Sequence, residues 1–465
     1  MREFRRHVVV IRLILLLVFI GMGIRLFDTV YSQGSRWLAS KYNTRLSVAK
    51  EQVVMGSITD CNGVTLAYDD ALGIRCYSEN NAIRYATAQT VGDVSSFSGT
   101  GVQTFHAGTL LGFSGSIIDR TWELYKGKSK QGDNIQLTVN ADLCADIAGA
   151  FPYGVKGAVT LINYKTGEIL AMVSMPTYDP ANLSLPVEDT AYMNKCLQGL
   201  YTPGSVFKLV TLTSALENLT GVLSEVYTCE GTKTFGSGNV TCMSGNEHHG
   251  TLTLREALTR SCNISFAQIG YELGSENLVK TAKTLGFNDN FIFADIKLYN
   301  SSIQTDINNV YDLAWTAVGQ GKTLVTPMHM ALIVSAIAND GVMPSPKLIK
   351  QVTGSTGIQR PHKSDGAYGT VMSSGTASII KEYMRDVVEY GTGTRAQVNG
   401  YRVCGKTGSA EVSDDKNVNT NAWFVGFIDD ERMPYAVSVV LEGAGSGGYH
   451  AAELASDALY YATTY

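Results

Sequence analysis

A serine and a lysine three positions apart, Ser205 and Lys208, stand in the stretch TPGSVFKLVTLTSALENL. Its apolar residues recur at helical spacing, which predicts an amphipathic helix opened by Pro203 and Gly204. Residues i and i+3 of a helix project from the same face. A serine hydroxyl needs an adjacent base, and a lysine desolvated in a cleft can supply one. The pattern therefore indicates a nucleophilic serine at a helix N-terminus, whose free N–H groups can stabilise an oxyanion.

The order of the motifs matters more than any one of them. S-x-x-K recurs at Ser47–Lys50, S-x-N occurs at several places, and KTG occurs twice, at Lys165–Gly167 and Lys406–Gly408. Only the second KTG follows both the Ser205 motif and an S-x-N motif at Ser261–Asn263 that lies between two predicted helices. The decoy copies have no partner motif in sequence. We therefore assign the chemistry to the ordered set.

The elements that must position these residues can be predicted from periodicity. GAVTLINYKTGEILAMVSM predicts two strands around a turn, which places the first KTG at a hairpin tip, where Gly167 tolerates positive φ. TLTLREALTRSCNISFAQIGYELG predicts two helices that meet near Ser261. Three strands and a closing helix are predicted near the end of the chain, in VCGKTGSAEV, AWFVGFI, YAVSVVLEG and HAAELASDALYYA. Together they predict one α/β (α+β) domain in which the first hairpin joins the last strands in a single sheet flanked by helices.

Length and charge exclude some classes of protein. The chain has 465 residues and a formal net charge of -5, so it is long enough for two or more domains. Binding to a polyanion needs clustered Lys and Arg. Nucleic acid is therefore not the expected partner.

The N-terminus carries a membrane signal. An apolar stretch from Val8 to Ile24 follows Arg2, Arg5 and Arg6 and is interrupted only by Arg12. Spanning the hydrocarbon core takes about 17–25 residues, so the stretch suffices if the interrupting arginine snorkels to the headgroups. A cleaved signal peptide is the alternative, with a weak small-x-small site at Gly21-Met22-Gly23. We favour an uncleaved single-pass anchor with its N-terminus inside, and both interpretations place the rest of the chain outside the cytoplasm.

The segment from 28 to 155 shows no catalytic constellation. It is polar and rich in Gly and Ser, with strand-like pieces such as RLSVAKEQVVM and a turn at Asp60-Cys61-Asn62-Gly63. We expect a mixed, β-rich lobe that supports the second part of the chain.

Cysteine spacing leaves two options open. Eight cysteines do not form the dense framework of a small secreted domain. Cys229 and Cys242 flank a Gly-rich segment, so a local disulfide is plausible. With His248, His249 and Cys262 they could instead hold zinc, although the spacing matches no finger pattern. We favour free or paired thiols at these positions and assign no metal.

Several separated stretches together resemble one known family. GAVTLINYKTGEILAMVSMPTYDP, YTPGSVFK, SCNISFAQIG, VGQGKTLVTPMHMA, GKTGSAE and AWFVGFI look like the transpeptidase domain of class B penicillin-binding proteins, from about Gly157 onward. In the N-terminal lobe, MGSITDCNG resembles an R-G-x-I-x-D-R-N-G segment, with Met55 and Cys61 in place of the two arginines. The resemblance implies the penicillin-binding/transpeptidase fold, and three parts: residues 1–27 as cytoplasmic N-terminus and anchor, 28–155 as pedestal and 156–465 as transpeptidase domain.

The resemblance also implies a role for each motif residue. Ser205 would be the acylated nucleophile, Lys208 its base, and Ser261 a proton relay to the leaving group. Asn263 would hydrogen-bond the substrate amide and Lys208.

The KTG strand would then bind the peptide. Lys406 and Thr407, followed by Gly408, would bind the terminal carboxylate of the donor. Backbone N–H groups of Ser205 and Ser409 would form the oxyanion hole.

The activity implied is that of a peptidoglycan D,D-transpeptidase that β-lactams inhibit covalently. It would need no metal or organic cofactor. Such proteins commonly pair with a polytopic membrane glycosyltransferase, and the expected location is the bacterial cell membrane with the catalytic domain outside.

Two other functions compete with the transpeptidase. A serine β-lactamase needs a base that hydrolyses the acyl-enzyme, such as a Glu followed four residues later by Asn. Between Asn263 and Lys406 the glutamates are Glu272, Glu276, Glu382 and Glu389, and none has that context. A β-lactam-sensing protein would need a cytoplasmic signalling domain, which is not visible in the sequence.

Overall fold

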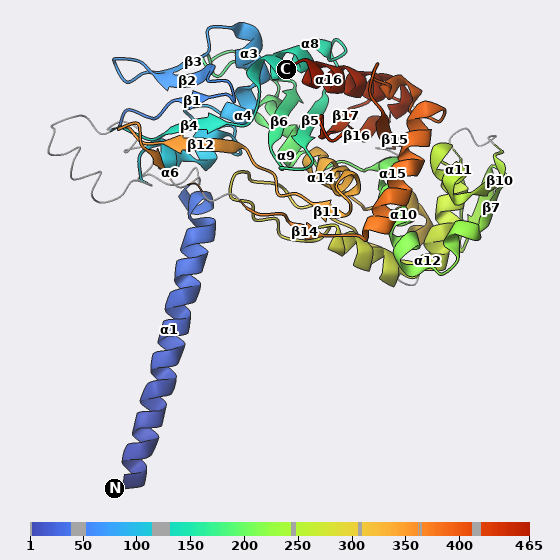
Figure 1. Cartoon of the computed structure of the whole chain (residues 1–465), viewed down its shortest axis with the longest axis horizontal. Helices are drawn as coiled ribbons and strands as arrows, with labels where there is room; N and C mark the ends of the chain where they lie inside the picture. Colours follow the sequence, from blue (N-terminus) through green and yellow to red (C-terminus); the bar gives the residue numbers. More distant parts are fainter. Residues whose placement is uncertain are drawn as a thin grey trace.

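The computed structural model consists of a long N-terminal helix and a body of sheets and helices (Figure 1). The structure describes these parts of the chain: residues 2–38, 53–113, 131–242, 248–305, 309–360, 362, 365–411 and 420–465. The Ser47–Lys50 decoy and most of RLSVAKEQVVM lie outside the described residues.

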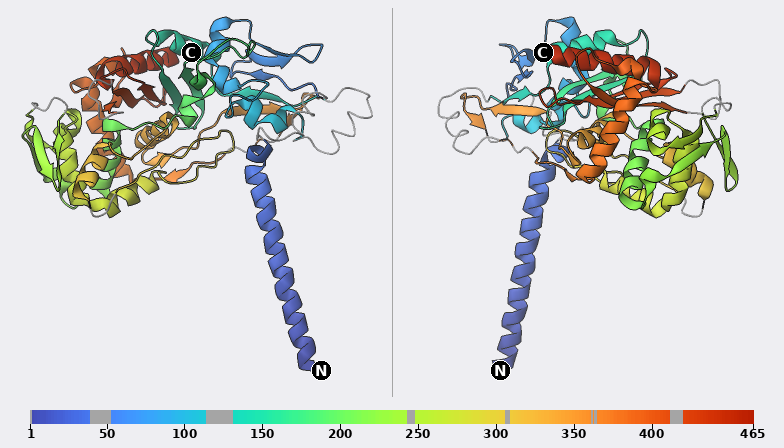
Figure 2. Two further views of the ribbon diagram at one scale, coloured as in Figure 1. Left: turned by 180° about the vertical axis from the view of Figure 1, so that it is seen from behind. Right: turned by 45° about the vertical axis from the view of Figure 1, so that its right-hand side comes forward.

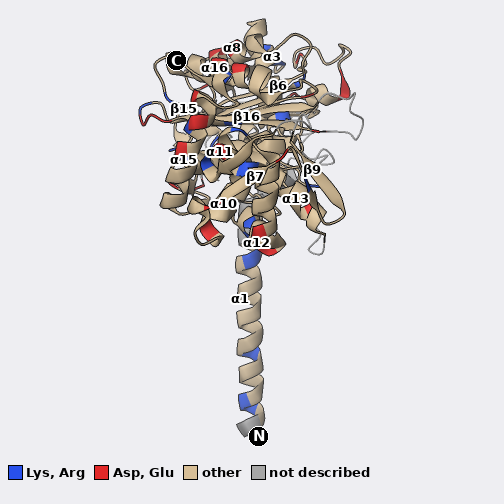
Figure 3. Cartoon of the chain, turned by 90° about the vertical axis from the view of Figure 1, so that its right-hand side faces the viewer, with Lys and Arg blue, Asp and Glu red and all other residues tan. Residues whose placement is uncertain are grey.

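Helix α1 (Arg2–Leu38) projects away from the body in every view (Figures 1 and 2). Its segment Phe4–Phe27 has a mean hydropathy of 2.6, and it is the one helix in the described part of the chain that is long and apolar enough to cross a membrane. Arginines lie toward both ends of the rod, and the stretch 13–24 between them is uncharged (Figure 3). This arrangement suits a membrane anchor, because basic residues flank the apolar span.

The N-terminal lobe is built on a six-stranded sheet in the order β13-β12-β4-β1-β2-β3. Its strands are β1 (Ile58–Thr59), β2 (Thr65–Asp69), β3 (Arg75–Tyr77), β4 (Asn134–Leu137), β12 (Ile349–Thr353) and β13 (Gln359–Arg360). Short helices among the described residues accompany it: α3 (Asn81–Ala86), α4 (Ala88–Val91), α5 (Val102–Phe105) and α6 (Ala107–Leu110).

Two of these strands come from far along the chain. Strand β12 pairs antiparallel with β4, with Val352 opposite Ile135, and β13 extends the same sheet. A segment of the second part of the chain therefore completes the sheet of the first. The division at 155/156 stays a prediction, and the sheet crosses it.

Two carboxylates of the lobe, those of Asp69 and Asp60, are hydrogen-bonded without the two arginines that Met55 and Cys61 replace. The backbone N–H of Met55 donates to Asp69 at 2.7 Å, and Arg75 forms a buried ion pair with the same carboxylate at 3.0 Å. Asp60 accepts from backbone N–H groups in the turn that contains Cys61. The predicted turn is present, and a second arginine of the lobe, Arg84, pairs with Asp179 at 3.0 Å.

A five-stranded antiparallel sheet organises the second part, in the order β15-β16-β17-β5-β6. Its strands are β5 (Gly157–Asn163), β6 (Ile169–Met175), β15 (Val403–Ala410), β16 (Asn421–Ile428) and β17 (Tyr435–Leu441). The first hairpin therefore joins the last strands in one sheet, as the sequence predicted. Ser438 lies opposite Thr160, which fixes the register between β17 and β5.

Helices cover both faces of this sheet (Figures 1 and 2). Helices α8 and α16 contact each other and pack on β6 and β17, whereas α14 packs on β5, β16 and β17 from the other face. Every residue of α14 is buried, as its position between the sheet and the outer helices requires. The longer helices of this part are α8 (Ala141–Ala150), α10 (Lys208–Asn218), α11 (Leu254–Thr259), α12 (Asn263–Thr284), α13 (Val310–Val318), α14 (Pro327–Ala338), α15 (Ser374–Glu389) and α16 (Ala452–Thr464).

Short elements connect these layers. The short helical turns are η1 (Asp189–Tyr192), α9 (Lys195–Gln198), η2 (Gly204–Phe207), η3 (Val222–Ser224), η4 (Thr394–Ala396) and η5 (Gly447–Ala451). The short strands are β7 (Val226–Cys229), β8 (Thr232–Phe235), β9 (Gly238–Thr241), β10 (Gly250–Thr253), β11 (Val342–Met343) and β14 (Gly369–Thr370). Pairs β7 with β10 and β8 with β9 each form a separate two-stranded sheet.

Candidate active site

A cleft lies where η2, the α11–α12 junction and strand β15 meet. Residues of all three predicted motifs reach it from these separate elements. Its lining consists of Ser205, Cys242, His249, Arg260, Ser261, Asn263, Thr392, Thr407, Gly408, Ser409, Ser446 and Gly448.

Ser205 lies in a tight 3-10 turn rather than in the α-helix. The turn spans Gly204–Phe207, and α10 begins only at Lys208. Gly204 has φ +56° and donates its N–H to Gly319 O at 2.8 Å. A Cβ at Gly204 would lie 2.8 Å from Ser409 O, so the turn packs directly on strand β15. The predicted helix is therefore correct in its body but begins three residues after Ser205, because this packing imposes a left-handed conformation on Gly204.

Lys208 is fully buried beneath the cleft and makes three hydrogen bonds. Its Nζ donates to Ser261 O at 2.6 Å, to Ser261 Oγ at 3.2 Å and to Asn263 Oδ1 at 2.7 Å. Burial lowers the pKa of Lys208 to about 8, because desolvation disfavours the charged ammonium. A lysine with this pKa is partly neutral near pH 7 and can accept a proton.

Ser261 is held in a strained backbone conformation between α11 and α12. Its φ is +55°, a region that non-glycine residues rarely occupy and that often marks a functional position. Its hydroxyl receives hydrogen bonds from two ammonium groups, Lys208 at 3.2 Å and Lys406 at 2.9 Å. The S-x-N and KTG motifs are thereby joined through one oxygen.

Asn263 begins α12, and both the oxygen and the nitrogen of its side-chain amide form hydrogen bonds. Its Oδ1 accepts from Lys208, and its Nδ2 donates to Thr241 O at 2.9 Å. These bonds fix the orientation of the amide.

In the KTG of β15, the side chain of Lys406 lies in the interior and that of Thr407 lies at the cleft. Lys406 is fully buried and donates to Ser261 Oγ and to Thr407 O. Burial, and then the charge of Lys208, lower the pKa of Lys406 well below its usual range. Thr407, whose hydroxyl lies 2.6 Å from that of Thr392, lines the cleft. Of these two side chains, that of Thr407 reaches the cleft, and the lysine charge lies behind it.

The neighbouring backbone is packed closely around the end of β15. The N–H of Gly447 donates to Ser409 Oγ at 3.2 Å. A Cβ at Gly408 would lie 3.1 Å from Pro203 O, just before the turn that carries Ser205. The main chain next to Ser205 therefore packs tightly against the main chain at Ser409, and both residues line the cleft.

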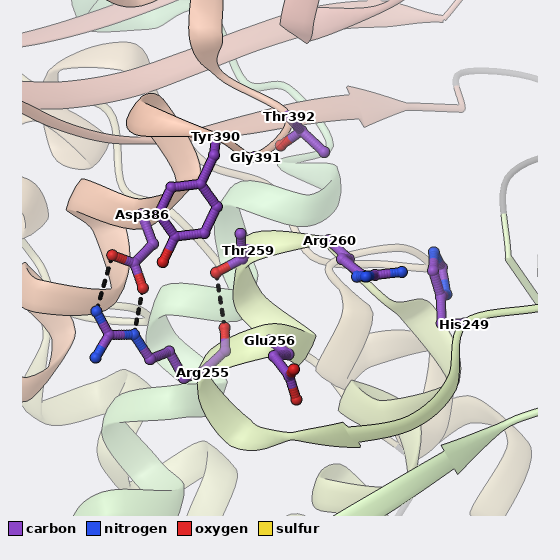
Figure 4. Close-up of a pocket in the computed structure, with 9 residues that line it drawn as sticks. All are labelled: His249, Arg255, Glu256, Thr259, Arg260, Asp386, Tyr390, Gly391 and Thr392. Atoms are coloured by element: carbon purple, nitrogen blue, oxygen red, sulfur yellow. Dashed lines mark hydrogen bonds and ion pairs between the residues drawn. The ribbon is translucent and has the colours of Figure 1, made fainter.

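The sequence did not indicate some of the lining residues. Thr392 follows α15 in a Gly-rich loop, and the surrounding sequence predicts only an ordinary turn there. A second pocket adjoins the cleft and shares His249, Arg260 and Thr392 with it. Figure 4 shows Arg260 and His249 side by side at one end of this pocket and an ion pair between Arg255 and Asp386 at the other.

The first copy of KTG is a turn, as predicted. Gly167 has φ +80°, and exposed Lys165 lies 4.0 Å from Glu431, away from the cleft residues. Lys165 takes no part in the network.

The arrangement can support acyl transfer to a serine. It combines a half-buried hydroxyl, a buried lysine of lowered pKa, and a second lysine that shares Ser261 with the first. Among the described residues that line the cleft there is no carboxylate. The carboxylate base that some β-lactamases use for hydrolysis is therefore not found among these residues.

The family model of the penicillin binding protein transpeptidase domain matches residues 157–460 of this chain. The chain is 30% identical over 386 residues to penicillin-binding protein 3 of Bacillus subtilis (strain 168), which covers 78% of this chain and 56% of the relative. The chain thus spans about half the length of such curated relatives.

Two solved structures have the same fold. The D,D-transpeptidase domain of a peptidoglycan glycosyltransferase from Eggerthella lenta is 28% identical, with a TM-score of 0.77 over 89% of this chain and 99% of that one. The penicillin G acyl-enzyme complex of penicillin-binding protein A from M. tuberculosis is 25% identical, with a TM-score of 0.79 over 89% of this chain and 100% of that one.

Proposed function

Because the chain belongs to the penicillin-binding protein transpeptidase family, we propose that it is a peptidoglycan D,D-transpeptidase. Ser205 attacks the carbonyl between the two D-alanines of a stem peptide, the terminal D-Ala leaves, and an amine of a neighbouring stem peptide accepts the acyl group. The observation that carries the proposal is that Lys208 and Lys406 share Ser261 directly beneath a cleft lined by Ser205.

The acylation step uses these groups in order. As the Oγ–C bond forms, Lys208 takes the proton of Ser205, and backbone N–H groups of Ser205 and Ser409 stabilise the oxyanion. As the C–N bond breaks, Ser261 relays a proton to the leaving amine. The lowered pKa of Lys208 supports its role as base.

Substrate binding falls to the remaining motif residues. Thr407 and the charge of Lys406 hold the terminal carboxylate, with Gly408 leaving room for the peptide along β15. Asn263 positions the substrate amide and Lys208 together. This acyl transfer involves no metal or organic cofactor.

The rest of the chain sets the location of the reaction. Helix α1 is the single-pass anchor of a bacterial cell-membrane protein, with its N-terminus (within residues 1–27) inside and the catalytic part (156–465) outside. The lobe 28–155 is a pedestal and partner surface. The partner is a polytopic membrane glycosyltransferase that makes the glycan strands this enzyme cross-links.

The test is intact-protein mass after exposure to a penicillin. The wild type should gain the mass of the drug, and Ser205→Ala should gain nothing. Ser47→Ala, at the decoy S-x-x-K, is the matched control and should label like the wild type. Labelling that survives in Ser205→Ala would refute the assignment of the nucleophile.

A further inference from the structure

Three cysteines and a histidine converge beside the active site. They come from four segments: Cys229 ends β7, Cys242 follows β9, His249 precedes β10, and Cys262 caps α12. Their ligand atoms all lie within 4.8 Å of one another. His248, which the sequence also offered, is exposed and outside the cluster.

The distances match a tetrahedral metal site better than a disulfide. The Sγ atoms of Cys229 and Cys242 lie 3.6 Å apart, and those of Cys242 and Cys262 lie 3.8 Å apart. A disulfide has an S–S bond of about 2.0 Å. Zn–S bonds of about 2.3 Å at tetrahedral angles place two sulfurs about 3.8 Å apart. The local disulfide that the sequence made plausible is therefore wrong for this structure, because three sulfurs stand at similar spacing.

The histidine completes the same geometry. His249 Nδ1 lies 3.4 Å from Cys229 Sγ and 3.7 Å from Cys242 Sγ. With Zn–N of about 2.1 Å and Zn–S of about 2.3 Å, tetrahedral ligands would be about 3.6 Å apart. We propose that these four side chains bind one zinc ion in a closed tetrahedral site. The sequence had left zinc unassigned because the spacing resembles no finger, whereas the fold brings the ligands together.

The cluster also has the surroundings of a structural metal site. Its three cysteines are buried, and Cys262 Sγ accepts from the backbone N–H of Ser265 at 3.4 Å in the first turn of α12. Such hydrogen bonds orient metal ligands and stabilise a thiolate. Four protein ligands leave no open position, so the zinc holds structure and does not activate water.

The fold explains why a metal is needed here. The β7–β10 and β8–β9 pairs are two-stranded sheets outside both large sheets, and isolated two-stranded hairpins are marginally stable in water. One zinc would tie the ends of β7 and β9 and the start of β10 to the first turn of α12. As zinc binds, the three thiols release their protons to solvent.

The site would also position the catalytic residues. Cys262 stands between Ser261 and Asn263, and Thr241, just before Cys242, accepts the hydrogen bond of the Asn263 amide. Zinc would therefore hold in place both Asn263 and its hydrogen-bond acceptor, Thr241, and so fix the amide that orients Lys208. This metal site does not depend on which acyl-transfer reaction the cleft performs.

Metal content of the full-length chain tests the proposal. The protein is purified in detergent with reduced thiols and without a polyhistidine tag, and zinc and iron are measured by elemental analysis. We expect one zinc per chain in the wild type and in two controls, His248→Ala and Cys76→Ser, which change a neighbouring histidine and a distant thiol. Cys229→Ser and His249→Ala should weaken zinc affinity by more than the 10–100-fold typical of changes around a metal site.

Two further measurements guard against misfolded variants. Cobalt substituted into the wild type should give the absorption of a tetrahedral thiolate site, and a chelator should lower the melting temperature of the wild type and both controls. If zinc-free wild type is offered zinc and binds less than a tenth of an equivalent, the proposal is overturned. The same holds if the wild type contains iron or a Cys229–Cys242 disulfide instead.

Acylation measures the link to the active site separately. Zinc-stripped protein should react with penicillin at least tenfold more slowly than the zinc-loaded form. Equal rates would overturn the positioning role. Failure of both forms to acylate, with one zinc bound, would instead contradict the proposed function.

Discussion

The ammonium of Lys406 lies 2.9 Å from the hydroxyl of Ser261, although 145 positions separate them in the chain. The same hydroxyl oxygen is 3.2 Å from the ammonium of Lys208. Two lysines therefore converge on one serine, and burial and then the charge of Lys208 lower the pKa of Lys406. This arrangement supports the proposal that Ser261 relays a proton between Lys208 and the leaving group.

Replacing Lys406 with alanine should slow acylation by penicillin. The change removes the charge behind Thr407 that attracts a carboxylate, and one charge-assisted hydrogen bond is worth about 1.5–3 kcal/mol, which is roughly tenfold to a hundredfold in rate. The acylation rate is measured by intact mass, with folding checked by circular dichroism.

Lys165→Ala is the matched control, because it alters the same tripeptide at the exposed hairpin tip. Its acylation rate should stay within about twofold of the wild type, since surface ion pairs such as the one with Glu431 contribute little. Equal effects at the two lysines would contradict the assignment of the second KTG.

Replacing Gly319 with alanine should displace the nucleophile. Gly319 has φ +93°, and an added Cβ would lie 2.0 Å from the carbonyl oxygen of Gly204, the residue before Ser205. The turn must shift to relieve this overlap. A displacement of this kind near 1 Å costs on the order of a hundredfold in rate.

Gly321→Ala separates overlap from backbone strain. Gly321 also has a positive φ, +80°, but an added Cβ there meets nothing within 4 Å. It should lose some stability and retain most of its acylation rate. If both variants acylate equally slowly, backbone strain rather than contact with Gly204 would be the cause.

Local patterns in the sequence predicted the elements that carry the site. The hairpin at Gly167 and the junction at Ser261 were predicted because turn residues interrupt strong apolar periodicity. The order of the three motifs then selected one KTG. These features depend on residues that are close in sequence.

Features set by distant contacts could not be predicted. The pairing of β12 with β4 joins segments about 200 residues apart, and no local pattern encodes it. The 3-10 turn at Ser205 depends on contacts of Gly204 with Ser409 and Gly319. Thr392 reaches the cleft through long-range packing, including its hydroxyl contact with Thr407 of β15. The sequence raised zinc at the cysteine cluster but left it unassigned for the same reason, since four separate segments supply the four side chains.

Acid should destabilise the fold through His329. Its ring is fully buried, with Nε2 donating to Leu285 O at 2.7 Å and Nδ1 accepting from Ser301 Oγ at 2.7 Å, so the neutral form is fully bonded. Burial lowers the pKa of His329 to about 4, against weaker opposing effects of the hydrogen bond to Leu285 O and then of the Asp289 charge. The unfolded chain, with an ordinary histidine pKa of about 6.5, then binds more protons below that pH.

Stability from His329 should therefore be complete above about pH 6.5 and fall as the pH drops toward 4, by about 3 kcal/mol in all. The measurement is the free energy of urea unfolding between pH 4 and 7 for the wild type and His329→Gln. The variant should be less stable at pH 7 but lose less on acidification. Identical slopes would show that the acid sensitivity arises elsewhere.

The fate of the acyl-enzyme separates a transpeptidase from a β-lactamase. Acylation needs Ser205, Lys208 and the oxyanion donors, whereas release to water needs a further base, and no carboxylate is found among the described residues that line the cleft. General-base assistance contributes about 10²–10⁴-fold, so hydrolysis should be slower by about that factor than in an enzyme that has the base. The drug adduct should persist long after acylation is complete, and a peptide ending in D-Ala-D-Ala should compete for labelling. Rapid loss of the adduct with accumulation of hydrolysed drug would favour the β-lactamase and contradict the proposed transpeptidase.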